Sequence, residues 1–571
     1  MSSTSTRNYV PANLNTSDFA VIEPLFVALE TRMIANAGAL EKWLFDCSEL
    51  GAVLSEEGAR RYINMTCHTD DAAAEKAYVL WVEDIVPKCK PHWQKLDEKY
   101  LASPARSTLP KERYFVFDRN TANDVALFRE ANIPLQTEEA KLDQQYNKIA
   151  GAMTVFFDGQ ERTLPQMSRY LEETDRAKRQ AAWEGLVSVR YQHREAFDEI
   201  LDKQIGLRDQ MAKNAGLSSY VDYAFRMYRR FEYTPRDCGT FHTAVQETCV
   251  PVVRKILERR RQTMKLDTLR PWDTGVDPLN RPPLRPFKTV DELIAGTRKV
   301  LAHVSPKFGE RLMEMQQEKC LDLESRKGKA PGGYQSTLDE VRRPFIFMNA
   351  AGMHDDVQTL LHEAGHALHA LATRDEPLLM YRTNPPIEFC EVASMGMELM
   401  AGEGLSELYS PEEHGRALRQ HLEGVIGLLP WIAQIDAFQH WIYTHPGHTH
   451  AERNAAWIDI DSKLAGGHRM VDMHGYEAYR ETSWQRQRHL WGNPFYYIEY
   501  GIAQLGALQL FANYRKDKAR AVAAYERALA LGGSRTLPEL FAAAEIRFDF
   551  GPATLGPLMQ LVDRELSQLP E

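Results

Sequence analysis

The chain has 571 residues, of which 26% are charged, and a formal net charge of -10. This length is enough for a large buried core and indicates more than one lobe. Because no long run of Lys or Arg offsets the negative charge, the composition argues against a nucleic-acid partner.

The cysteine usage and the hydropathy indicate in which cellular compartment the protein is expected. The seven cysteines are scattered without close pairs, which argues against a disulfide framework or a cysteine-ligated metal and is typical of a reducing compartment. The N-terminus lacks a basic region followed by an apolar core, so no signal peptide is expected. The most apolar stretch, GVIGLLPWIAQIDAF, contains Pro430 and Asp436 and is too short to span a bilayer. We therefore expect a cytoplasmic protein that has no membrane segment.

Helical spacing of apolar residues dominates the N-terminal part of the chain. It runs through residues 22–55, 76–103 and 179–216, and a further helix is predicted to open after Thr137. Between these helices, residues 153–164 read as a β-hairpin, with Asp158-Gly159 as its turn. The first 200 residues are predicted to form a helical N-terminal lobe.

Residues 201–571 are predicted to form a catalytic region that completes one compact unit with the N-terminal lobe. Within it, residues 269–285 are rich in Pro, Gly and Asp and are the best candidate for a linker or long loop. A glycine loop (328–336) and a short strand, RPFIFMN, precede a chain that is helical from Asp355 onward. The predicted fold class is mainly α, with a small sheet beside the motif described next.

The string HEAGH places His362 and His366 four residues apart with Glu363 between them. Residues four apart lie on one helix face, so both imidazoles can point at one metal ion while Glu363 reaches a water on it. Gly365 lies inside this predicted helix at a cost of about 1 kcal/mol relative to Ala, which indicates a packing reason for it. The pattern therefore predicts a catalytic Zn²⁺ site, one ion per chain.

A catalytic zinc needs a third protein ligand and one open position. Glu388, Glu391 and Glu398 follow on the next predicted helix, at spacings that put them on roughly one face. Spacing alone does not choose among them. His369 is predicted to be packed or to support a ligand, and the histidines of HPGHTH (445–450) are predicted to lie on the surface.

The strings HEAGHALH and EFCEVASM resemble the thimet-oligopeptidase-like family of zinc metallopeptidases, and within it the oligoendopeptidase F group. Supporting strings extend from about residue 269 to residue 551. The resemblance implies two helical lobes around a deep substrate channel. The family's phenylalanine-x-glutamate-x-x-serine pattern, applied to EFCEVAS, selects Glu391 as the third metal ligand. Glu388 and Glu398 then become residues that orient a ligand histidine.

The family also uses a histidine and tyrosines from a C-terminal segment, which is HLWGNPFYYIEY here. The resemblance implies catalytic roles for His489, Tyr496 and Tyr500, with Tyr497 a weaker candidate. The alternative for this segment is an aromatic core patch.

The implied function is zinc-dependent endopeptidase hydrolysis of short unstructured peptides, with Glu363 as general base. Tyrosine hydroxyls and His489 would support the oxyanion. The strand RPFIFMN is predicted to pair with an extended peptide. The alternatives are a related helical zinc carboxypeptidase or dipeptidyl carboxypeptidase, and a peptide-binding pseudo-enzyme; a structural zinc protein would need a fourth ligand. The sequence leaves the oligomeric state open.

Overall fold

The fold is described from a computed structural model, which covers residues 7–465 and 470–570. The chain divides into two compact units, each made of three segments. Unit 1 comprises residues 1–126, 285–410 and 506–548, and unit 2 comprises residues 127–284, 411–505 and 549–571. The expected boundary after residue 200 falls inside helix α9, and the assignment of functions to those two regions stays a prediction.

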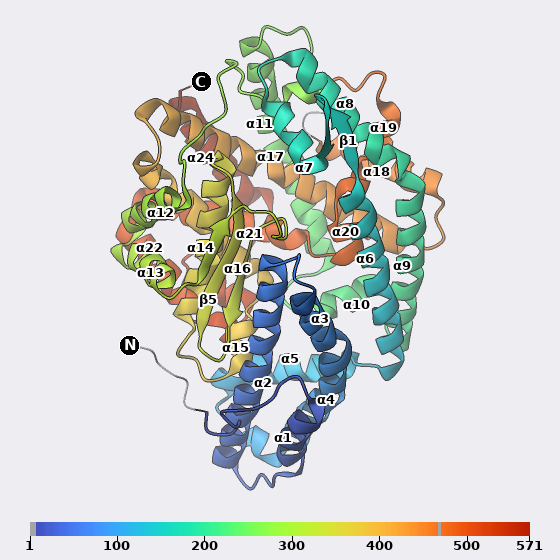
Figure 1. Cartoon of the computed structure of the whole chain (residues 1–571), viewed down its shortest axis with the longest axis vertical. Helices are drawn as coiled ribbons and strands as arrows, with labels where there is room; N and C mark the ends of the chain where they lie inside the picture. The colour runs from blue at the N-terminus through green and yellow to red at the C-terminus, as the bar shows by residue number, and fades with distance from the viewer. Residues whose placement is uncertain (1–6, 466–469, 571) are drawn as a thin grey trace. The chain divides into compact units, whose positions relative to one another are not determined.

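The chain is mainly helical, as predicted (Figure 1). The elements of unit 1 are α1 (Phe19–Thr31), α2 (Ala37–Cys67), α3 (Ala72–Leu80), α4 (Val86–Ala102), α5 (Lys111–Leu127), α12 (Val290–Val304), α13 (Pro306–Gln317), β3 (Leu321–Glu324), β4 (Tyr334–Leu338), β5 (Arg343–Ala350), α14 (His354–Ala372), α15 (Leu379–Thr383), α16 (Ile387–Met400), α22 (Lys518–Leu529) and α23 (Leu537–Ala543).

The elements of unit 2 are α6 (Ile133–Ala152), β1 (Thr154–Phe157), β2 (Gln160–Thr163), α7 (Leu164–Ser168), α8 (Arg176–Gln192), α9 (Arg194–Asn214), α10 (Tyr220–Met227), α11 (Pro235–Thr263), α17 (Pro411–Thr444), α18 (His450–Leu464), α19 (Glu477–Glu481), α20 (His489–Gly492) and α24 (Pro552–Gln568). Helix α21 (Ile498–Lys516) begins in unit 2 and ends in unit 1.

The predicted hairpin is confirmed as β1 and β2, which pair antiparallel with Phe157 opposite Gln160. Its turn residues, Asp158 and Gly159, have φ of 53° and 74°. Two successive positive φ values match the right-handed twist of the flanking strands, which is why Asp-Gly predicts this turn.

A three-stranded sheet in unit 1 has the order β3-β5-β4. Strand β5 pairs parallel with β3 on one side and antiparallel with β4 on the other. The strand RPFIFMN is therefore β5, as expected, but the prediction that it pairs with a peptide is wrong because both of its edges are already occupied. Strand β4 lies at the edge of this sheet, and an edge strand leaves one row of backbone groups unpaired within the sheet.

Helix α14 packs against β5 and carries the HEAGH motif. Its buried positions include Val357, Leu360, Leu361 and Leu368, which follow the helical period. The helix begins at His354, and Asp356 lies in its first turn. Its carboxylate accepts the backbone N–H groups of Ala351 and Met353, both at 2.8 Å, and a carboxylate there also opposes the positive end of the helix dipole.

Helices α14 and α16 pack against each other (Figure 1), and they approach closely at Gly365. A Cβ atom on Gly365 would lie 2.5 Å from Ser394 Cα and 2.7 Å from the carbonyl oxygen of Ala393. Both are backbone atoms of α16, so no side-chain rotation relieves the overlap. The close contact between the two helices is therefore the packing reason that the sequence analysis expected for Gly365.

The segment 269–285 contains one 3₁₀ turn, Pro271–Asp273, and the boundary between the units falls near its end, after Leu284. Asp273 is fully buried and binds Arg176 and Arg179 within unit 2, so the start of this loop is firmly anchored. In the described part of the chain, none of the helices combines the length and the hydropathy needed to cross a bilayer.

We predict that Gly365→Ala lowers the free energy of unfolding by up to about 2 kcal/mol. Overpacking at a well-packed contact costs about 1–3 kcal/mol, which exceeds the helix-propensity gain of about 1 kcal/mol. Urea unfolding measures the change. The matched control is Gly424→Ala in α17, where the new methyl group meets no atom within 4 Å and stability should hold or rise. A Gly365→Ala protein as stable as the parent would contradict the backbone contact.

Candidate metal centre

Three side chains of unit 1 bring their donor atoms together between α14 and α16. The Nε2 atoms of His362 and His366 are 3.2 Å apart. Glu391 Oε2 lies 3.4 Å from the first and 3.6 Å from the second. The i, i+4 spacing on α14 supplies the two histidines, and the close approach at Gly365 brings α16 near enough to supply the carboxylate.

These donors fit a zinc ion. Zinc binds imidazole nitrogen and carboxylate oxygen at about 2.0–2.2 Å, so tetrahedral ligands lie roughly 3.3 Å from one another. The three observed separations, 3.2, 3.4 and 3.6 Å, bracket that value. Two imidazoles, which become neutral on binding a metal, and one carboxylate also form a donor set typical of catalytic zinc, with a fourth position left for water.

Neighbouring polar groups orient two of these side chains. His362 Nδ1 lies 2.7 Å from Glu398 Oε1, an arrangement in which Nδ1–H donates and Nε2 is left to act as a ligand. Ser394 Oγ donates to Glu391 Oε2 at 3.1 Å. Glu388 is buried on α16 but is not a member of the three-donor group. Of the two glutamates expected to orient a histidine, Glu398 is the one that contacts His362.

Burial and charge set the protonation states of the group. Burial lowers the pKa of His366 to about 4. Burial would raise the pKa of Glu391, but the hydrogen bond with His362 and the charges of both histidines bring that pKa down to about 2. Burial would likewise lower the pKa of His362, whereas its bonds to Glu391 and Glu398 raise it well above the usual value. His366 is therefore neutral and Glu391 ionised, as metal binding requires.

Glu363 lies beside this group on α14 and is 7% exposed. Burial raises its pKa to about 7, against the opposing charge of His362. The backbone of Gln335, in the edge strand β4, favours the ionised form of Glu363. A carboxyl group with a pKa near 7 can both accept and release a proton at neutral pH. The sequence analysis places Gln335 in the glycine loop (328–336) and gives it no role, whereas the structure places it in strand β4.

The other histidines differ from this group. His369 is 4% exposed and packs against Phe389, and burial lowers its pKa to about 3, which confirms the prediction of a packed residue. His445 and His450 are exposed and His448 is partly buried. None of these three belongs to a metal-type cluster within the described residues.

His489, Tyr496 and Tyr500 belong to unit 2, where they form an aromatic cluster. The His489 ring lies 5.8 Å from that of Tyr496 and 5.9 Å from that of Tyr500, and the two tyrosine rings are 5.3 Å apart. Tyr497 joins them at 4.9 Å from His489. These contacts agree with the expected aromatic patch, and the catalytic roles of the three residues stay a prediction.

Comparisons with known proteins place this chain in a family. The model of peptidase family M3 matches residues 169–555. The chain is 23% identical over 360 residues to group B oligopeptidase PepB of Streptococcus agalactiae, an alignment that covers 61% of this chain and 55% of PepB. It is 26% identical over 292 residues to oligopeptidase PepF of Bacillus subtilis, covering 50% of this chain and 42% of PepF. The chain thus spans about half the length of the curated relatives it matches.

Solved structures resemble the whole chain. PZ peptidase A, solved with an inhibitor, has a TM-score of 0.89 and 27% identity, with 99% of both chains covered. Oligoendopeptidase F from Enterococcus faecium has a TM-score of 0.64 at 17% identity, covering 97% of this chain and 98% of its own, and shows the fold alone. The chain belongs to peptidase family M3, a family of metallopeptidases. PepB and PepF are named oligopeptidases, and the resemblance seen in the sequence is confirmed.

Proposed function

We propose that this protein is a zinc-dependent endopeptidase that hydrolyses internal bonds of short, unstructured peptides. The observation that carries the proposal is the His362–His366–Glu391 group, whose donor atoms lie 3.2 to 3.6 Å apart with Glu363 beside them. His362, His366 and Glu391 would hold the ion. When bound, the metal supplies Lewis acidity, which makes water a usable nucleophile near neutral pH.

Glu363 carries the proton transfers in this proposal. Its carboxylate accepts a proton from the attacking water and delivers it to the leaving amine. A pKa of about 7 suits both steps, because a group that titrates near the working pH is populated in both forms. Glu398 holds the His362 ring in the tautomer that presents Nε2. His489, Tyr496 and Tyr500 are proposed to donate hydrogen bonds to the developing oxyanion.

The edge strand β4 is the proposed peptide-binding element. Strand β4 follows the glycine loop and pairs with β5 along one edge only. Its residue Gln335 interacts with Glu363 through the backbone. A peptide added along this edge would be held by main-chain hydrogen bonds, which tolerate many side chains. The printed names of the relatives, oligopeptidase and oligoendopeptidase, support a peptide substrate. A cytoplasmic location stays a proposal based on the composition.

We predict that Glu363→Gln retains the metal and the fold but lowers peptide hydrolysis by about 10²- to 10⁴-fold, the usual contribution of a positioned acid-base group. The amide keeps the size of the side chain but cannot accept the proton. Turnover of a quenched fluorescent peptide and the zinc content of the same sample are the measurements. Hydrolysis near the parent rate in a zinc-loaded sample would refute the role of Glu363.

We predict a ranked loss of metal among three glutamates of α16. Glu391→Ala should remove a ligand and lower zinc occupancy most. Glu398→Ala should weaken zinc binding by about 10- to 100-fold, the usual effect of losing a partner of a ligand histidine. Glu388→Ala is the matched control, because this residue is buried on the same helix but outside the three-donor group. Zinc titration against a competing chelator gives the affinities. A larger loss for Glu388→Ala than for Glu391→Ala would remove Glu391 from the site.

We predict that cleavage depends on substrate folding more than on sequence. A folded substrate must first unfold locally, at a cost that can approach its whole stability of about 5–15 kcal/mol. One test sequence is offered as a free peptide, with both ends blocked, and within a stably folded host domain; mass spectrometry maps the cuts. The blocked peptide should be cut internally, and the folded host should survive. A requirement for a free carboxyl end would favour a carboxypeptidase instead.

The same assay tests the metal. Chelator should abolish cleavage of the blocked peptide, and added zinc should restore it. Full activity in a sample shown to be free of metal would refute the zinc mechanism.

A further inference from the structure

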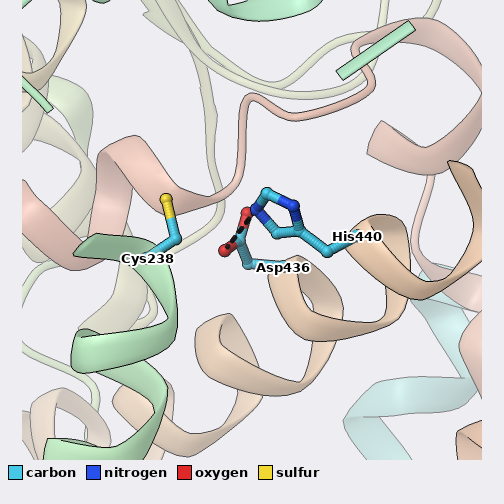
Figure 2. A group of neighbouring side chains, drawn as sticks. All are labelled: Cys238, Asp436 and His440. Atoms are coloured by element: carbon cyan, nitrogen blue, oxygen red, sulfur yellow. Dashed lines mark ion pairs between the residues drawn. The ribbon is translucent and has the colours of Figure 1, made fainter. Parts of the chain in front are cut away.

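A second cluster of metal-binding residue types lies in unit 2, between α11 and α17. Each helix contributes a pair at i, i+4: Cys238 and His242 from α11, and Asp436 and His440 from α17. Residues at this spacing share a helix face, so the two pairs face each other. Figure 2 shows the Asp436 carboxylate between the Cys238 side chain and the His440 ring.

The donor atoms of Cys238, Asp436 and His440 all lie within 4.8 Å of one another. Through Oδ2 the Asp436 carboxylate comes within 3.5 Å of His440 Nε2, so the carboxylate and the imidazole are near enough to share one ion. Two of the three side chains are deeply buried, with Asp436 0% exposed and Cys238 1% exposed, and the His440 side chain is 17% exposed. Burial at this depth excludes the bulk water that would otherwise satisfy the polar atoms.

Two buried atoms of the cluster have no hydrogen-bond partner among the described residues. They are Asp436 Oδ1 and His440 Nε2. Native proteins rarely leave such atoms unsatisfied, because each costs about 1–3 kcal/mol, and more for a charged group. An ion coordinated by both atoms removes that cost. The other Asp436 oxygen, Oδ2, is 2.7 Å from His242 Nε2, the carboxylate–histidine contact that orients a metal ligand.

The charges favour a divalent ion of the zinc type. A cysteine thiolate and a carboxylate together neutralise two positive charges, and thiolate with imidazole is a donor set that suits zinc. The positive charge of Arg230 acts on Cys238, Asp436 and His440, but its guanidinium binds Glu499 at 2.7 Å and the carbonyl oxygen of Phe495 at 2.6 Å. Its charge is therefore balanced by a carboxylate of its own.

We propose that Cys238, Asp436 and His440 bind a second zinc-type divalent cation between α11 and α17, with one coordination position left open, and that His242 positions the Asp436 carboxylate. This site is independent of the proposed peptidase centre, whose three donors contain no sulfur. A ligand set with a thiolate has an optical signature that the peptidase centre lacks, which makes the two ions separable by experiment.

The test is reconstitution of the metal-free full-length chain with Co²⁺. The parent protein should bind two equivalents and show thiolate-to-cobalt charge-transfer absorption in the near ultraviolet. Cys238→Ala should bind one equivalent and lose this absorption. Cys249→Ala is the matched control, since Cys249 is 0% exposed on the same helix and lies outside the cluster; it should keep both equivalents and the absorption.

Glu391→Ala separates this proposal from the proposed function. This variant should lose the peptidase metal and keep the thiolate absorption. The proposal for either site can therefore be refuted without refuting the proposal for the other. The spectrum of the parent protein needs no substitution and decides the matter even if Cys238→Ala does not fold. A parent protein without the thiolate absorption, or a Cys238→Ala protein that retains it, would overturn the proposal.

Discussion

The backbone contact between α14 and α16 is the constraint on which the candidate metal centre depends. The histidine pair needs only the period of one helix, but the carboxylate must come from another element. Gly365 permits α16 to approach so closely that a single methyl group would overlap Ser394 Cα. Glu391 and Ser394 are three residues apart on α16, so the same approach delivers the carboxylate and the hydroxyl that binds it. The packing of α14 against α16 therefore also sets the geometry of the metal centre.

Much of the centre could be predicted from the sequence because its strongest signals are local. The spacing of His362 and His366, the neighbouring Glu363 and the interior Gly365 all belong to one helix, whose period is regular. Asp158-Gly159 predicted a hairpin for the same reason: two residues fix the turn by their own φ preferences. The choice of Glu391 was different, because spacing alone left three glutamates on one face and the family resemblance selected among them.

The remaining features depend on contacts that are distant in sequence. The segment RPFIFMN reads as a strand, but its place at the centre of the sheet depends on parallel pairing with β3, which no local pattern specifies. Strand β4 therefore forms an edge of this sheet, and its residue Gln335 interacts with Glu363 through the backbone. The cluster of Cys238 and Asp436 was not predicted from the sequence for the same reason. Two unremarkable i, i+4 pairs become a group only when α11 and α17 pack together.

The two clusters differ in the net charge they would carry, and this difference separates their chemistry. Two neutral imidazoles and one carboxylate leave a divalent ion with a net charge of about +1, which favours ionised water and a developing oxyanion. A thiolate, a carboxylate and an imidazole leave it neutral. An uncompensated charge is expensive to bury, so the neutral set suits the deep position of Asp436, at 0% exposure. The charged set suits His362, whose side chain is 25% exposed and remains within reach of water.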